Sequence, residues 1–421
     1  MRPTLTWREG VGFTVAAVLG TGVLVLPAVT AAMAGPAALV AWLAMAVCAV
    51  PMALTLGRLA AALPDAGGIA AYARAAFGIP AGRAVGLLYL GTVPVGAPAA
   101  ALIGAGYVSA YFRLGHGAEV AVAAAMLATA LVLNALGVEL SARAAAVIVG
   151  AIAALLGAAV LAALPHTRLL PPGPFAPHGL IPIGRAFALL YWAFVGWEML
   201  GHMAEEFVSP GRDIPRALAA SLAVVDALYL AVAWATVATG TYAGGGADGL
   251  ARLIALGLGP AGALVAVAVA ALVTYGTTHT YVAGFSRLVY AQAREGNLPP
   301  ALARLHPRRG TPVAVLAAMA VPFALVLAWD AVSPFSLAAL LAWPSAIFIV
   351  LYVAAMAAGV RLLPNRGDRA VAALAAAVSA AALPFAGWAV TLPAAIAAAA
   401  VGSERWRRRR AHPWARQAAG G

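Results

Sequence analysis

The chain has no lysine, a single cysteine and few charged side chains of any kind. All 26 basic residues are arginines, 14 residues are acidic, and charged residues make up 10% of the 421 positions. Soluble globular domains carry about a quarter charged residues, so this composition excludes an ordinary soluble domain. Because Cys48 is the single cysteine, it cannot form an intrachain disulfide. It lies in an apolar run, where it packs as a small hydrophobe.

Several motifs of other functional classes are missing from the sequence. There is no P-loop, and the run from His202 to Glu205 lacks the HExxH pair of zinc ligands, so we expect neither a metal site nor a cofactor. The seven histidines are scattered, and no filter sequence is repeated as a channel requires. The net charge of +12 does not indicate nucleic acid, because the arginines lie between apolar runs and form no stripe. An integral-membrane enzyme and a channel are the alternatives of another class, and the sequence favours neither.

Long apolar runs make up most of the chain. Hydrophobic residues make up 64% of the chain and the mean hydropathy is +0.94. A helix needs about 20 apolar residues to cross a bilayer, and the runs predict an all-α membrane protein with about twelve crossings. The predicted spans are 10–32, 36–62, 83–112, 117–137, 143–164, 184–207, 215–241, 260–290, 312–330, 335–360, 369–384 and 386–402.

The arginines predict how these spans are oriented. Cytoplasmic loops hold the excess of basic residues, and a cytoplasmic N-terminus leaves 26 − 4 = 22 arginines on that side. The basic tail 403–421 must then be cytoplasmic too, which requires an even number of spans. We expect a multi-pass protein of a bacterial inner membrane with both termini inside.

Two of the predicted spans carry glycine where a membrane helix should be continuous. Gly20-Thr21-Gly22 interrupts the first, and Gly196 lies among bulky residues in the sixth. Paired glycine-broken helices are the best sequence indication of a transporter's midplane binding site. Glu198 follows the second interruption, and a carboxylate at membrane depth costs at least ~2.5 kcal/mol on insertion scales, which marks it as a functional candidate.

Five segments, in this order, resemble the amino acid–polyamine–organocation (APC) transporters over nearly the whole chain. They are GTGVLVLP at 20–27, PDAGGIAAYARAAFG at 64–78, WAFVGWE at 192–198, EEFVSPGRDIPRA at 205–217 and SRLVYAQAREGNLP at 286–299. The resemblance implies a single transporter domain over 1–421 with a five-plus-five inverted repeat (the LeuT-like fold), helices 1–5 within 10–164, helices 6–10 within 184–360, and helices 11 and 12 within 369–402. The run FVGWEMLGHMAEEF is most similar to bacterial exporters of methionine and branched-chain amino acids. It implies alternating-access export of neutral, apolar L-amino acids, with an importer or an amino-acid/amine exchanger as the alternative.

The resemblance also implies roles for particular residues. Amides around the first break would bind the substrate carboxylate, carbonyls around the second would bind its ammonium, and an aromatic ring would cover the pocket. The expected substrate-binding residues are Gly20, Thr21, Gly22, Val23, Trp192, Ala193, Phe194, Val195 and Gly196. Close packing of small residues is the competing explanation for the glycines, and plain packing is the competing explanation for Trp192.

Polar side chains in the spans supply the candidates for gating and coupling. Glu198 is a candidate proton-sensing gate, with His202 one turn away as its partner. A buried polar partner for a neighbouring helix is the competing explanation for Glu198. Thr277 and Thr278 resemble a sodium-ligating position, although intramembrane threonines commonly bond their own backbone. Asp226, the other acid that we expect within the spans, would form a helix-to-helix hydrogen bond. The expected coupling ion is a proton, with Na⁺ as the alternative, and nothing in the sequence indicates the oligomeric state.

Overall fold

A computed structural model describes most of the chain. The described residues are 5–63, 67–138, 142–168, 174–199, 207–243, 248–294 and 298–402, with the side chains of 142–146 left out. Within these ranges the chain is helical and has no strand, apart from one isolated parallel bridge between Leu5 and Phe207. The all-α membrane class predicted from composition is therefore confirmed.

The helices follow the predicted apolar runs closely. They are α1 Trp7–Val18, α2 Gly22–Ala34, α3 Ala38–Ala62, α4 Gly68–Phe77, α5 Ile79–Phe112, α6 His116–Leu136, α7 Ala142–Ala163, α8 Ile181–Leu190, α10 Pro210–Thr239, α11 Gly249–Arg294, α12 Val313–Val332, α13 Leu337–Leu362 and α14 Arg366–Ala386. Short 3₁₀ turns lie at Gly35–Ala37, Leu164–His166, Pro300–Ala303 and Gly387–Val390.

Nine helical stretches in the described ranges are long and apolar enough to cross a membrane. Three of them are joined pairs, and one of these, Gly249–Arg294, is joined across a bend at Gly259. Gly22–Ala62 has 41 residues, about 60 Å if straight at 1.5 Å per residue, which is twice the ~30 Å apolar thickness of a bilayer. The 3₁₀ turn at Gly35–Ala37 separates α2 from α3, and the turn at Gly387–Val390 divides Arg366–Gly402 in the same way.

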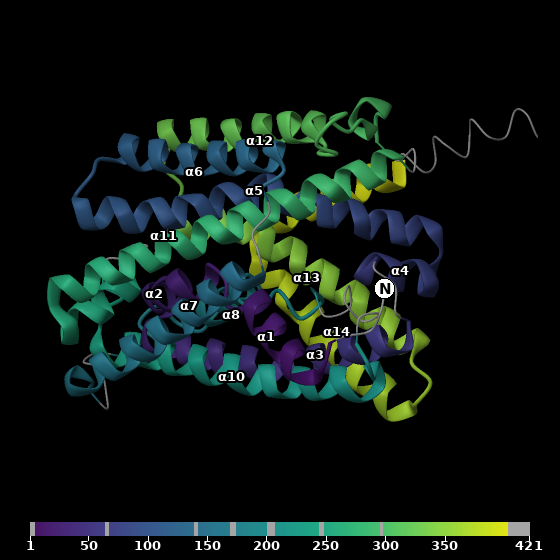
Figure 1. Ribbon diagram of the computed structural model, residues 1–421. Helices are drawn as coiled ribbons and strands as arrows, with labels where there is room; N and C mark the ends of the chain where they lie inside the picture. The colour runs from purple at the N-terminus through teal and green to yellow at the C-terminus, as the bar shows by residue number, and fades with distance from the viewer. Residues whose placement is uncertain are drawn as a thin grey trace, which may run out of the picture.

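The helices lie roughly along one common direction (Figure 1). In that view α6 and α12 run side by side along one edge, and α10 runs along the opposite edge with α1 and α3 packed on it. The longest helices, α5 and α11, pack against each other between these edges.

Small residues let these helices approach closely. A Cβ on Gly104 of α5 would clash with the Thr274 hydroxyl of α11. A Cβ on Gly257 would lie 2.5 Å from the carbonyl oxygen of Ala162 in α7. Membrane helices associate through such contacts because lipid provides no hydrophobic drive between them.

Glycine also bends α11 near its start. Gly259 has φ +63° and ψ −162°, a conformation that only glycine adopts readily, and Pro260 follows it. The residues before the bend pack on α2, because a Cβ on Gly249 would meet the Cβ of Ala28. The predicted span 260–290 therefore begins at the bend, and an additional helical segment precedes it.

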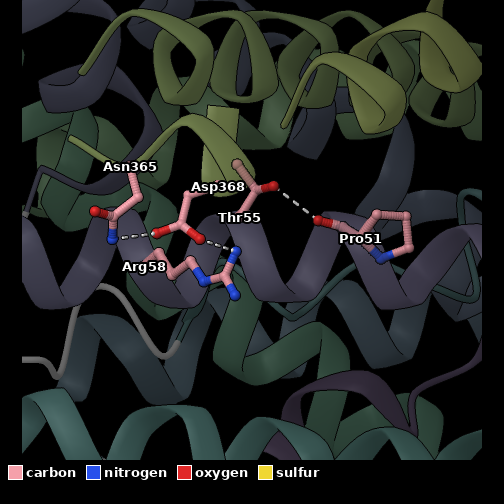
Figure 2. A network of polar contacts seen from close by, with 5 residues as sticks. All are labelled: Pro51, Thr55, Arg58, Asn365 and Asp368. Atoms are coloured by element: carbon pink, nitrogen blue, oxygen red, sulfur yellow. Dashed lines mark hydrogen bonds and ion pairs between the residues drawn. The ribbon is translucent and has the colours of Figure 1, made fainter. Parts of the chain in front are cut away.

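A polar network ties α3 to α14 near their ends. Arg58 Nη1 lies 2.6 Å from Asp368 Oδ1, and Asn365 donates to the other carboxylate oxygen at 3.3 Å (Figure 2). Thr55, one turn before Arg58, donates to the carbonyl oxygen of its own helix at Pro51. The arginine side chain is 36% exposed, so this pair contributes about 0–1 kcal/mol, as exposed ion pairs do.

Candidate functional site

The first predicted break is present in the structure. Helix α1 ends at Val18 and α2 begins at Gly22, so Leu19, Gly20 and Thr21 leave the helix. The Gly20 amide bonds the carbonyl of Val18 at 2.7 Å, which closes a tight turn. Since the first amides of a helix have no intrahelical partner, α2 presents free donors and the positive end of its dipole here.

The second predicted break is present as well. Helix α8 ends at Leu190, and the chain runs through turns up to Glu198. Gly196 has φ +127°, and a Cβ on it would lie 2.7 Å from the carbonyl oxygen of Ala17 in α1. Both its conformation and its contact with backbone therefore require glycine at this position.

The two breaks contact each other directly. A Cβ on Gly22 would lie 2.7 Å from Cα of Ala193. The indole of Trp192 donates to the Thr21 hydroxyl at 3.2 Å. Among the described residues, by contrast, only the Val18 carbonyl lies near a Cβ built on Gly20, at 3.9 Å. Gly20 therefore borders open space, whereas the space beside Gly22 is filled by the other broken helix.

Tyrosine hydroxyls occupy several carbonyls that the breaks set free. The Tyr229 hydroxyl of α10 lies 2.8 Å from the Val18 oxygen and 3.1 Å from the Ala193 oxygen, so it bridges both breaks. Tyr352 of α13 lies 3.3 Å from the Phe194 oxygen. These tyrosines were missing from our sequence-based site, and a phenol in an apolar span, which needs a polar partner, was the signal that could have found them.

A third tyrosine binds the helix that follows the first break. The Tyr107 hydroxyl of α5 donates to the Leu24 carbonyl of α2 at 2.6 Å. Its side chain is fully buried. Together the three phenols come from α5, α10 and α13, so each of these helices is bonded to the backbone at or beside a break.

The two aromatic candidates of the second break have different surroundings. Phe194 packs between Trp42 of α3 and Tyr229, with ring centroids 6.3 and 5.2 Å away. The ring of Trp192 extends toward α5, where a Cβ on Gly96 would lie 3.1 Å from it. Trp192 therefore lies between α5 and the first break, and Phe194 is part of an aromatic cluster.

Glu198 is buried beside the second break. Its side chain is 3% exposed, and its Oε2 accepts from the Gly196 amide at 3.0 Å and from the Tyr352 hydroxyl at 2.8 Å. Its Oε1 has no partner among the described residues. Tyr89 and Tyr281 are also close enough to interact with this carboxylate. The candidate partner His202 lies outside the described residues.

The threonines of α11 bond within their own helix. Thr274 donates to Ala270 at 2.8 Å and Thr278 donates to Thr274 at 2.7 Å, and both side chains are fully buried. Thr277 is half-buried. A hydroxyl that donates to its own helix keeps its lone pairs, so these contacts do not decide between a structural role and a cation site.

Among the described acids, the membrane-embedded set is larger than we expected from the sequence. Asp330, near the end of α12, is 3% exposed and accepts from the Phe335 amide at 2.9 Å, and His116 of α6 lies 3.5 Å from it. We had counted only Glu198 and Asp226 because Asp330 falls at the end of a predicted span. The buried Oδ1 of Asp226 does not form the hydrogen bond that we expected, since it has no partner among the described residues.

Both ends of the first broken helix are covered in this structure. On the α1 side, the Val208 amide bonds the Leu5 carbonyl at 3.0 Å, and a Cβ on Gly10 would lie 2.8 Å from the Phe207 ring. On the α2 side, the Ala37 amide bonds the Phe175 carbonyl at 2.9 Å.

At the N-terminus of α1, the backbone and side chain of Thr6 bond Glu9 and lower the pKa of its carboxyl.

Two broken helices that meet at their breaks inside an apolar bundle are the arrangement of a secondary transporter. Comparison with known proteins gives the family, because a model described as amino acid permease matches residues 5–407. The chain therefore belongs to the amino acid permease family, within the APC transporters predicted from its motifs.

Individual relatives span most of the chain. An uncharacterized amino acid permease of Bacillus subtilis (strain 168), YecA, is 40% identical over 401 residues, which are 95% of each chain. The L-methionine/branched-chain amino acid exporter YjeH of Escherichia coli (strain K12) is 30% identical over 371 residues, 87% of this chain and 88% of the relative. The vacuolar cationic amino acid transporter 8 of Arabidopsis thaliana is 26% identical over 74% of this chain and 56% of its own length.

Proposed function

We propose that this protein is a secondary active transporter that exports neutral, apolar L-amino acids of the methionine, leucine, isoleucine and valine class by alternating access. The observation that carries the proposal is the contact between the two breaks, Gly22 to Ala193 and Trp192 to Thr21. It brings helix amides and freed carbonyls into one place at the middle of the bundle, and an amino acid offers a carboxylate and an ammonium to match them.

The open side of Gly20 is the proposed position of the substrate carboxylate. The free amides at the start of α2 supply donors, and the absence of a Cβ permits close backbone approach. The carbonyls of the second break are the acceptors for the ammonium. Since Tyr229 and Tyr352 already lie on some of these oxygens, the ammonium uses their remaining lone pairs or displaces a phenol.

A neutral side chain suits the groups around this position. A cationic substrate requires an acid to neutralise it, and Glu198, the acid beside the second break, already receives an amide and a phenol on one oxygen. Similarity to the L-methionine/branched-chain amino acid exporter of E. coli supports the same class. Similarity to a cationic amino acid transporter makes an importer or exchanger of cationic substrates the second candidate.

Glu198 is the proposed gate. It links the second break to α13 through Tyr352, so a change in its protonation changes a bond between two helices that must move apart. We further propose that 10–164 and 184–360 are the inverted repeats, that a bacterial inner membrane is the location with both termini cytoplasmic, and that the protein performs no catalysis. A proton is the proposed coupling ion, and Thr277 and Thr278 are the place to look for Na⁺ if it replaces the proton.

Uptake by proteoliposomes tests the substrate class. Labelled leucine, methionine, arginine and glutamate are compared with and without a pH gradient and with and without Na⁺. We expect saturable transport of leucine and methionine that unlabelled isoleucine and valine compete for, and little transport of arginine or glutamate. Saturable arginine transport without competition by leucine would overturn the proposal and favour the second candidate.

A further inference from the structure

Asp226 is an acidic residue in the membrane that the site described above does not use. It is residue 17 of the 30 in α10, counted as 226 − 210 + 1, so it lies at the middle of a membrane-spanning helix. Its side chain is half-buried, and its Oδ1 is buried with no hydrogen-bond partner among the described residues. An acid at this depth is retained only where it serves a function or pairs with another group.

No described group is a hydrogen-bond partner of the buried Oδ1 of Asp226. Helix α10 packs against α1, α2, α3, α7 and α11. Helix α2 has no titratable side chain, and the side chain of Arg143 in α7 lies outside the described residues. The titratable and charged groups of the other elements are Arg8 and Glu9 of α1, Cys48 and Arg58 of α3, and Arg252, Tyr275, His279, Tyr281, Arg287, Tyr290 and Arg294 of α11.

None of these groups is a hydrogen-bond partner of the buried oxygen. Several of them bond elsewhere: Glu9 to Thr6, Arg58 to Asp368, and His279 to the Val138 carbonyl. A buried carboxyl without a partner is best accommodated in its neutral form, because the neutral group avoids the cost of desolvating a charge.

The position of Asp226 couples it to the breaks. Tyr229 lies three residues further along α10, on a neighbouring part of the helix surface, and is close enough to interact with Asp226 electrostatically. The hydroxyl of Tyr229 bridges Val18 and Ala193, one carbonyl from each break. A charge that appears or disappears on Asp226 therefore acts on the bond that holds the two broken helices together.

We propose that Asp226 binds the proton that moves with the transported amino acid, a role that rests on the proposed transport function. The carboxyl is protonated while α10 is closed on the breaks and releases its proton when the bundle rearranges. The chain contains no lysine that could bind this proton. The role differs from that of Glu198, which lies beside the second break with an amide and a phenol on its carboxylate.

The experiment measures proton and amino acid movement in the same proteoliposomes. A pH-sensitive dye in the lumen reports protons during an imposed leucine gradient, and exchange of labelled for unlabelled leucine reports transport that needs no net proton movement. Wild-type vesicles should show leucine exchange and a leucine-driven pH change. Asp226→Asn should keep the exchange and lose the pH change by at least about tenfold, in the range of coupling between two sites.

Two comparison variants locate the effect. Asp330→Asn removes another buried carboxylate, one whose oxygen already accepts an amide, and should leave the pH change as in the wild type. Asp226→Glu restores an acid and should restore part of it. Infrared difference spectra of the purified protein give a readout without transport, since a protonated carboxylic acid band should be present in the wild type and absent from Asp226→Asn.

Each outcome bears on one proposal. A pH change that persists in Asp226→Asn overturns the proton role, and so does the joint loss of exchange and pH change in a variant that keeps its infrared spectrum otherwise unchanged. Leucine exchange in the wild type without any leucine-driven pH change overturns proton coupling but leaves the transport function standing. No leucine exchange in the wild type overturns the transport function itself.

Discussion

Replacing Gly22 with alanine should push the two broken helices apart. The new Cβ would lie 2.7 Å from Cα, 3.0 Å from Cβ and 3.2 Å from the nitrogen of Ala193. Ordinary van der Waals contact begins at 3.4 Å, so the two backbones must separate by at least 3.4 − 2.7 = 0.7 Å. Backbone atoms cannot rotate away as a side chain can, and the separation must also lengthen the bond between Trp192 and Thr21.

The expected loss of stability follows from two opposing effects. Overpacking a close contact costs about 1–3 kcal/mol, while alanine is favoured over glycine in a helix by up to about 1 kcal/mol. The contact dominates because Gly22 is the first residue of α2, where helix propensity matters least. We therefore expect Gly22→Ala to lower the free energy of unfolding by about 1–2 kcal/mol and to slow leucine transport.

Gly20→Ala is the matched control for this variant. Its Cβ would have one neighbour among the described residues, the Val18 carbonyl at 3.9 Å. Gly20 is also not one of the described glycines with a positive φ. Stability should therefore stay within about 0.5 kcal/mol of the wild type, as for uncrowded substitutions. Leucine affinity should nevertheless fall, because the methyl group enters the open space assigned to the carboxylate.

Thermal unfolding of the purified proteins and leucine uptake distinguish the two variants. The reasoning predicts loss of stability and transport for Gly22→Ala, and loss of affinity alone for Gly20→Ala. A Gly22→Ala protein with wild-type melting temperature and transport would refute the close contact. Wild-type leucine affinity in Gly20→Ala would place the carboxylate elsewhere.

Three further tests, two of them with a control variant, address other parts of the protein. Gly10→Val should loosen α1, because its Cβ meets the buried ring of Phe207 at 2.8 Å, and the α1 amides should exchange hydrogen faster. The control Gly12→Val, whose Cβ has no described neighbour within 4 Å, should leave the exchange rate unchanged. Glu198→Gln keeps an acceptor for both of its donors and should flatten the dependence of transport rate on pH, whereas a packing role predicts an unchanged profile. Tyr229→Phe should lower the free energy of unfolding by about 1–3 kcal/mol, as when buried acceptors lose their donor. The control Tyr111→Phe removes an exposed hydroxyl that lies 3.5 Å from its acceptor, and it should cost less than about 0.5 kcal/mol. Denaturation of both proteins measures the difference.

Sequence alone was sufficient for the class of fold and for both breaks. Twenty-residue apolar runs can satisfy their backbone in lipid only as helices, which is why the span boundaries were predicted well. Gly20 to Gly22 and Gly196 were recognisable because glycine in an apolar helix weakens it. The bend at Gly259 was missed because an apolar residue run continues on both sides of it.

The partners of the breaks could not be predicted in the same way. That Gly22 meets Ala193, and that Tyr229 reaches both breaks, depends on how α10 and α8 are rotated about their axes. Periodicity gives the buried face of a helix but not its neighbour on that face. The apolar faces here are wide and rich in alanine, so several rotations would bury them equally well.

The tyrosines suggest how such a site changes state with few charges. The hydroxyls of Tyr107, Tyr229 and Tyr352 lie within hydrogen-bond distance of four backbone oxygens at or beside the breaks, and they come from three different helices. When α1 and α2 move relative to those helices, each bond must be replaced by water, by substrate or by another phenol, because a carbonyl left bare in a buried place costs about 1–3 kcal/mol. An amino acid ammonium is a better donor than a phenol, since charge-assisted hydrogen bonds are roughly twice as strong as neutral ones. In the transport mechanism that we propose, substrate binding displaces a phenol and releases a helix, which couples occupancy of the site to movement of the bundle.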